Sequence, residues 1–102
     1  MNLYEIMKVE NCMSKSSVYQ YRFSFRLTEE FINRFETSAE VKYHRNFPKP
    51  SFNITFADGT RIVGVLRDVS FKAYFPPETA EPSKNSFESV LTENVSSYET
   101  GE

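Results

Sequence analysis

Tryptophan is absent from this 102-residue sequence, and cysteine and histidine occur once each, as Cys12 and His44. A single cysteine excludes an internal disulfide, and one cysteine with one histidine is too few soft ligands for a structural zinc site. The sequence has only three glycines, too few for a glycine-rich phosphate loop or a dinucleotide-binding fingerprint. No run approaches the ~18 consecutive apolar residues that a membrane-spanning helix needs. We therefore expect no metal, no cofactor and no membrane insertion.

Residues suited to catalysis are also scarce. A nucleophile needs a base within hydrogen-bonding distance, and His44 is the only side chain that titrates near neutral pH. Cys12 belongs to an N-terminal segment that we expect to be flexible, so a pair with His44 is not expected. The acidic residues of the central part fit a helix start or turns: Glu29, Glu30, Asp58 and Asp68. We therefore predict no catalytic residues and no enzymatic activity.

We expect one domain, over residues 15–95, between two ends that lack periodicity. Residues 1–14 are predicted to be a flexible segment, and residues 96–102 a disordered acidic tail. The N-terminal segment does not resemble a secretory signal, because Glu5 and Lys8 interrupt its apolar residues. The sequence therefore predicts a cytoplasmic location.

Aromatic residues are abundant, and much of the sequence alternates between apolar and polar side chains. Ten phenylalanines and six tyrosines make up 16% of the chain. The alternation is clearest over residues 17–27, and it predicts further strands over residues 40–45, 51–57, 60–67 and 69–75. The dipeptide Asp58-Gly59 favours a two-residue hairpin turn. We expect these strands to form one curved antiparallel sheet with an aromatic core.

Two segments have the periodicity of short helices. Thr28 is a suitable N-cap for a helix that ends near Ser38, with apolar residues three and four positions apart. A second helical pattern begins at Pro82 or Ser83 and ends near Asn94. The order of elements predicts an α+β domain: a single curved antiparallel sheet of four to five strands, with its aromatic face covered by two short helices.

Charge is unevenly distributed along the sequence. Residues 14–75 hold ten lysines or arginines against six acidic residues, whereas residues 76–102 hold one lysine against six glutamates. We hypothesise a basic face opposite the aromatic core that binds anions or nucleic acid; its candidate residues are Arg22, Arg26, Lys42, His44, Arg45, Lys49 and Lys72. The acidic residues 76–102 are a candidate for folding back onto this face. A further interpretation is that these cations only solvate the open side of the sheet.

Two short motifs resemble the signature of the PilZ family, R-x-x-x-R followed by D-x-S-x-x-G. They are Arg45-Asn-Phe-Pro-Lys49 and Asp68-Val-Ser-Phe-Lys-Ala73. The resemblance implies a β-barrel that binds cyclic diguanylate, with ligand contacts from Arg45, Lys49, Asp68 and Ser70. Lys49 stands in place of the second arginine and Ala73 in place of the glycine. Such a barrel has further strands after Ala73, where this sequence has two prolines and a helical pattern.

The main functional prediction is a small non-catalytic module that acts by binding a protein partner or by self-association. It depends on an exposed edge strand that can pair with another chain, and residues 17–27 and 69–75 are the candidates for that edge. The alternative is the anion or nucleic-acid binder described above. That alternative includes a degenerate cyclic-dinucleotide site of the PilZ kind.

Overall fold

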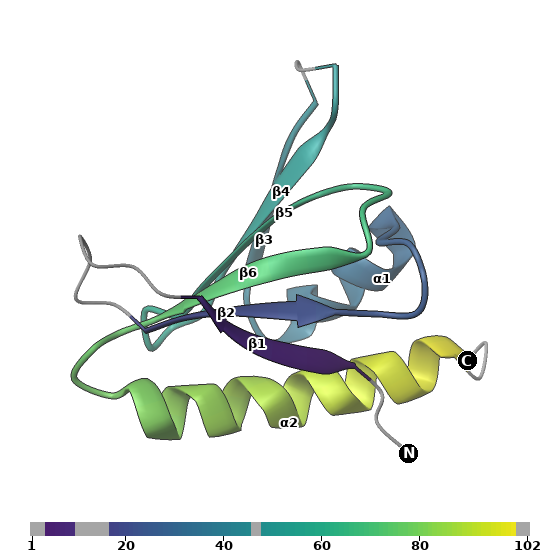
Figure 1. The fold of residues 1–102 in the computed structure, drawn as a ribbon. Helices are drawn as coiled ribbons and strands as arrows, with labels where there is room; N and C mark the ends of the chain where they lie inside the picture. The colour runs from purple at the N-terminus through teal and green to yellow at the C-terminus, as the bar shows by residue number, and fades with distance from the viewer. Residues whose placement is uncertain (1–3, 10–16, 46–47, 100–102) are drawn as a thin grey trace.

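The computed structural model describes residues 4–9, 17–45 and 48–99, which form an α+β fold around one six-stranded antiparallel sheet (Figure 1). The strand order is β1-β2-β6-β5-β4-β3, and the sheet does not close into a barrel, so β1 and β3 are its edges. The elements, in chain order, are β1 (Glu5–Val9), β2 (Ser17–Arg22), α1 (Glu29–Asn33), the 3-10 helix η1 (Arg34–Thr37), β3 (Glu40–His44), β4 (Ser51–Thr55), β5 (Arg61–Val65), β6 (Ser70–Phe75) and α2 (Ala80–Glu99).

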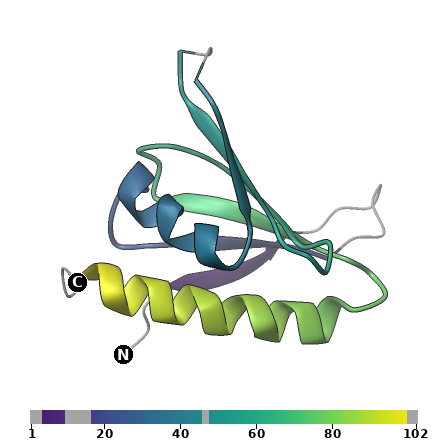
Figure 2. The same ribbon diagram turned by 180° about the vertical axis from the view of Figure 1, so that it is seen from behind.

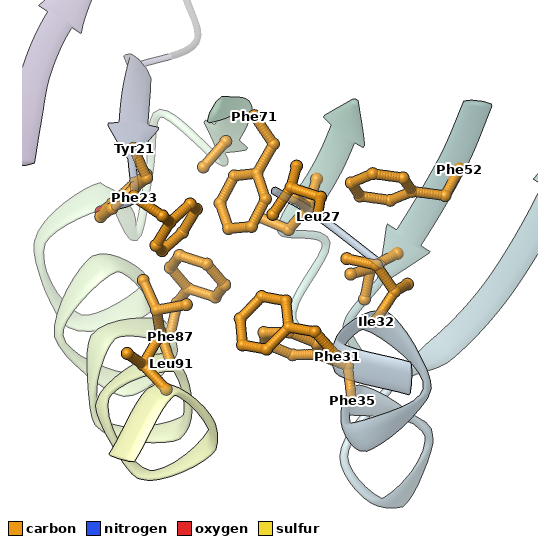
Figure 3. Packing of buried hydrophobic residues seen from close by; sticks show 14 of the residues in the cluster. Tyr21, Phe23, Leu27, Phe31, Ile32, Phe35, Phe52, Phe71, Phe87 and Leu91 are labelled. Carbon is orange, nitrogen blue, oxygen red and sulfur yellow. The ribbon is translucent and has the colours of Figure 1, made fainter. Parts of the chain in front are cut away.

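Both helical segments lie on the same side of the sheet. Helix α2 crosses beneath β1, β2 and β6, while α1 and η1 lie beside its C-terminal half (Figures 1 and 2). Side chains from the strands and from both helices point into one shared core (Figure 3). The prediction that two helices cover the aromatic face is confirmed. The prediction that both are short is wrong, because α2 has 20 residues.

Local sequence signals explain the start of α1. The Thr28 side chain accepts a hydrogen bond from the Phe31 amide at 3.2 Å, and Glu29 and Glu30 occupy the first turn. An N-cap of this kind satisfies one of the amides that a helix start leaves unpaired, and acidic residues there favour the helix dipole. Phe31 and Ile32 are fully buried, so the short helix is held mainly by packing.

The β4–β5 hairpin is confirmed, but its turn differs from the predicted two-residue form. The Phe56 amide bonds to the Thr60 carbonyl, which leaves a three-residue loop in which only Gly59 has a positive φ, of 97°. A turn followed by a left-handed glycine is the usual three-residue hairpin loop. Asp58 has a different role, because its Oδ1 accepts a hydrogen bond from the Thr60 amide at 2.9 Å.

Asp58 is expected to make the stability of this protein depend on pH in the acid range. Burial alone would raise the pKa of its carboxyl group, but hydrogen bonds from Thr60 and Ser83 outweigh burial and lower the pKa. A lowered pKa in the folded state means that stability present at neutral pH is lost as the pH falls below about 5 and through that pKa. Urea unfolding at pH 7 and pH 3 should therefore show a smaller pH effect in Asp58→Asn than in the wild type. Equal pH effects in both would contradict this role.

The structure corrects the predicted ends of the domain. Residues 1–14 are expected to be flexible, whereas Glu5–Val9 form β1 and pair with β2. The predicted number of four to five strands is therefore wrong, because β1 brings the sheet to six. Residues 96–102 are expected to be disordered, whereas α2 continues to Glu99. Contacts made across the fold explain both differences: Tyr4 packs on core rings, and Val95 near the end of α2 is fully buried.

The predicted edge strands are also wrong. Strands β2 and β6, which correspond to the two candidates, pair with each other and each has a second neighbour. The strand predicted over residues 17–27 ends at Arg22, because the chain then crosses to the β5–β6 turn. There the Phe23 amide bonds to the Val69 carbonyl at 2.8 Å and the Leu27 amide to the Asp68 carbonyl at 2.7 Å.

Candidate binding surfaces

Four of the predicted site residues lie on strands and face the open side of the sheet: Arg22, Lys42, His44 and Lys72. The register places Arg22 diagonally from Lys72 on the paired strands β2 and β6, but it separates both from Lys42 and His44 on β3. Between Lys42 on β3 and Lys72 on β6 stand Asn53 and Val63, one on each intervening strand. Three strand spacings correspond to about 14 Å across the sheet. The open face therefore carries dispersed cations and has no compact basic cluster along this row.

Neighbouring groups further reduce the positive charge that the open face presents to a ligand. The Lys42 Nζ lies 3.1 Å from a carboxylate oxygen of Glu40, and Arg22 stands opposite Glu5 in the β1–β2 register. The His44 ring shares a 2.9 Å hydrogen bond with the Asn53 amide. These contacts favour the interpretation that the open face is a solvated surface.

Arg45 lies on the helix side and does not belong to the open face. Its guanidinium donates two hydrogen bonds to the Glu29 carboxylate, at 2.7 and 2.6 Å, and lies 4.7 Å from the centre of the Tyr43 ring. These bonds from Arg45 lower the pKa of Glu29. Burial, together with the nearby Glu29 carboxylate, raises the pKa of Tyr43 to about 12. Arg45 is thus engaged in joining β3 to α1.

Neither Arg26 nor Lys49 lies on a strand, and both line a cavity of about 460 Å³. Arg26 is predicted to lie on a strand, whereas it follows the end of β2, in the loop that leads to α1. The lining comes from three parts of the chain: Arg26; Pro48, Lys49 and Pro50; and Val65, Leu66, Arg67 and Asp68. Arg67 also lines the cavity but is not among the predicted site residues, because no local sequence pattern links it to Arg26.

Of the four positions implied by the resemblance to the PilZ signature, two are brought together and two are not. Lys49 and Asp68 line the same cavity, but Arg45 is held by Glu29. The Ser70 hydroxyl lies on the open face, where it accepts a hydrogen bond from the Gln20 side chain at 3.1 Å. The barrel implied by the resemblance is also not observed, since the sheet is open.

The acidic C-terminal segment packs on the aromatic face, so the hypothesis that it folds onto the basic face is wrong. Phe87 of α2 is buried against core rings of the strands. Glu88, on the adjoining side of the helix, accepts a hydrogen bond from the buried Tyr21 hydroxyl at 2.8 Å and pairs with Lys84 at 2.7 Å. Burial and this bond to Glu88 raise the pKa of Tyr21.

The β1 edge carries the most exposed apolar side chains of the described residues. Ile6 is 43% exposed and Met7 is 66% exposed, and they are the two large apolar residues with high exposure in that part of the chain. Ile6 stands opposite the buried Tyr21, so it faces the helix side, and Met7 stands opposite Gln20 on the open side. This edge is not among the predicted binding residues, because residues 1–14 are expected to be flexible.

The described residues contain no group of three or more His, Cys, Asp or Glu side chains that could hold a metal ion. Cys12 lies outside the described residues, so its predicted separation from His44 stays a prediction. No described helix is long and apolar enough to cross a membrane. Comparisons with models of protein families, with curated proteins and with solved structures found no match.

Proposed function

We propose that this protein is a non-catalytic interaction module that acts by pairing its β1 edge with the β1 edge of a second copy. The observation that supports the proposal is the exposure of Ile6 and Met7 together on an edge strand. An edge strand presents unpaired backbone amides and carbonyls, which readily accept another strand. Exposed apolar side chains beside such an edge add a hydrophobic contribution to the pairing.

The other edge of the sheet is less suited to this role. Strand β3 presents Glu40, Lys42 and His44 on the open side, and all three are exposed. Charged side chains along an edge oppose strand addition, because pairing would desolvate them or place like charges together. Strand β1 also carries the exposed Glu5 and Lys8, but they flank Ile6 and Met7, whereas β3 has no apolar side chain exposed to that degree. This difference between the two edges favours association through β1.

Symmetry limits how two β1 strands can meet. A two-fold axis perpendicular to the sheet keeps each residue on the same face in both copies, so a residue pairs only with one an even number of positions away. In the register centred on Met7, the two copies of Met7 stand opposite each other. Ile6 of one copy then stands opposite the aliphatic stem of Lys8 of the other, and Glu5 stands opposite Val9. The centre of this interface is therefore apolar. Five residues per copy bury less than the ~1,200 Å² of a stable interface, so the dimer is expected to be weak and concentration-dependent.

The Met7→Lys variant tests this proposal. Two lysines then meet at the symmetry axis, where like charges directly opposite destabilise a strand pair. We expect the dimer dissociation constant to rise at least ~10-fold, while the fold is unchanged because the position is exposed. The measurement is sedimentation equilibrium from ~10 μM to ~1 mM protein.

The matched control is His44→Lys, which places the same side chain at an exposed position on the opposite edge. It should dimerise as the wild type does. A wild-type protein that stays monomeric over the whole concentration range would refute the proposal. So would an equal loss of dimer in both variants.

A further inference from the structure

Three positive side chains, those of Arg26, Lys49 and Arg67, line the cavity between the loop after β2, the segment before β4 and the β5–β6 turn. We propose that this cavity binds a small molecule that carries a phosphate group. Its volume of about 460 Å³ lies within the ~300–1,000 Å³ typical of small-molecule sites. The proposal is independent of the β1 edge.

Backbone hydrogen bonds hold the walls of this cavity in place. The Arg67 amide bonds to the Leu27 carbonyl at 2.7 Å, and the Leu27 amide bonds to the Asp68 carbonyl at 2.7 Å. The Leu66 amide bonds to the Pro50 carbonyl at 2.9 Å. These bonds join the three wall segments, and Leu27 between them is fully buried. The backbone of these walls therefore needs little reordering when an anion binds, and the exposed side chains of Arg26, Lys49 and Arg67 extend from it.

The charge of the cavity is not neutralised. Among the ion pairs of the described residues, none involves Arg26, Lys49 or Arg67. One guanidinium nitrogen of Arg26 donates to the Arg67 carbonyl at 3.0 Å, which leaves its remaining donors for a ligand. Asp68 is the one acidic residue in the lining, and its Oδ1 accepts the Val69 amide at 2.8 Å. Three positive charges against one negative charge favour an anion, and arginine is well suited to phosphate oxygens.

The backbone of Arg67 is a second, independent feature of this wall. Its φ is 76°, in the left-handed region, and it is the one described residue other than glycine with a positive φ. An L-residue with a long side chain is strained there, whereas glycine is not. Strained residues of this kind cluster at functional sites. At this turn the strained residue places a guanidinium on the cavity wall, which glycine cannot do.

The remaining lining defines the rest of the ligand. Pro48, Pro50, Val65 and Leu66 contribute an apolar wall beside the cations. Such a wall favours a carbon skeleton attached to the phosphate over inorganic phosphate alone. A long phosphate backbone is less favoured, because two strands separate the cations of β3 from Lys72 on β6, so no continuous basic track crosses the sheet from this cavity.

The test is calorimetric titration of the full chain with phenyl phosphate and with inorganic phosphate at low salt. We expect phenyl phosphate to bind more tightly than inorganic phosphate. Arg67→Gly should weaken binding at least tenfold and at the same time raise the melting temperature, because it removes both the cation and the strain. Lys49→Gln should weaken binding without raising the melting temperature. Lys72→Gln, which removes a cation of the open face, should bind as the wild type does.

Three results would overturn the proposal. The first is no binding of either probe by the folded wild type up to ~10 mM. The second is binding that Lys72→Gln weakens as much as Arg67→Gly does. The third is tighter binding of a ten-nucleotide single strand than of phenyl phosphate, which would assign the anion affinity to an extended surface instead of this cavity.

Discussion

Replacement of Phe87 by alanine is expected to lower the free energy of unfolding by about 3–5 kcal/mol. Phe87 is 2% exposed, and its ring centre lies 5.3–6.3 Å from those of five other rings, which come from β2, η1, the β4–β5 loop and β6: Tyr21, Phe35, Phe56, Phe71 and Phe75. Removal of the ring loses its own burial and leaves a cavity that surrounding rings fill poorly. Since domains of this size have stabilities of ~5–15 kcal/mol, the variant should be close to unfolding.

Urea unfolding followed by circular dichroism measures this loss. The matched control is Ser89→Ala, an exposed position on the same helix, where alanine should be neutral or slightly stabilising because of its helix propensity. A Phe87→Ala protein within ~1 kcal/mol of the wild type would mean that α2 does not pack against the sheet as described.

The second large effect is expected at Gly64, where any side chain must overlap its neighbours. A Cβ atom added there would lie 2.7 Å from Cζ of Phe52 and 2.9 Å from Cβ of Phe71. The Phe52 ring is fully buried, and the Phe71 Cβ is fixed to the backbone of β6, so neither can move aside easily. Overpacking of this kind typically costs ~1–3 kcal/mol. Gly64→Ala should lose that much stability in urea unfolding.

The neighbouring residue offers a comparison for this loss. Val63 lies on the open face and is half-buried, so Val63→Ala deletes atoms without creating an overlap. Gly64→Ala should be the less stable of the two, although it adds only one methyl group. If Gly64→Ala were as stable as the wild type, the close approach of β4 and β6 across Gly64 would be wrong.

Much of the sheet could be predicted because its strands alternate strongly. Phe52 and Ile54 on β4, and Phe71, Ala73 and Phe75 on β6, are all buried, as their spacing indicates. The strands carry their own signal, since every second side chain must be apolar if one face packs against helices. The Thr28 cap and the β4–β5 hairpin also depend on neighbouring residues, and both were predicted.

The missed parts of the fold depend on contacts between distant residues. Strand β1 is held by Tyr4, whose ring packs 5.7 Å from that of Tyr21 and whose hydroxyl bonds to Thr92 at 3.0 Å. No local pattern near residue 4 reveals a partner 88 positions away. The full length of α2, unlike β1, has a local signal in the sequence. Val95 continues the four-residue spacing of Phe87 and Leu91, which indicates that the helix extends beyond Asn94.

The candidate binding surfaces were also hard to predict, because they depend on which distant segments lie together. Alternation predicts correctly that Lys42 and Lys72 face away from the core, but it does not define the order of the strands. Only the order shows that two strands separate them. Likewise, Arg26, Lys49 and Arg67 line one cavity because backbone hydrogen bonds join the loop after β2, the segment before β4 and the β5–β6 turn. Nothing in the local sequence indicates these bonds.

The proposed pairing through β1 is tested most directly by amide hydrogen exchange of the wild-type protein at low and high concentration. In a β1–β1 dimer the outward-facing amides of Glu5–Val9 become hydrogen-bonded, so their protection should rise with protein concentration. The amides of β3, at the other edge, should exchange at the same rate throughout. If the protection of β1 does not change between ~10 μM and ~1 mM protein, the proposed β1–β1 pairing is wrong.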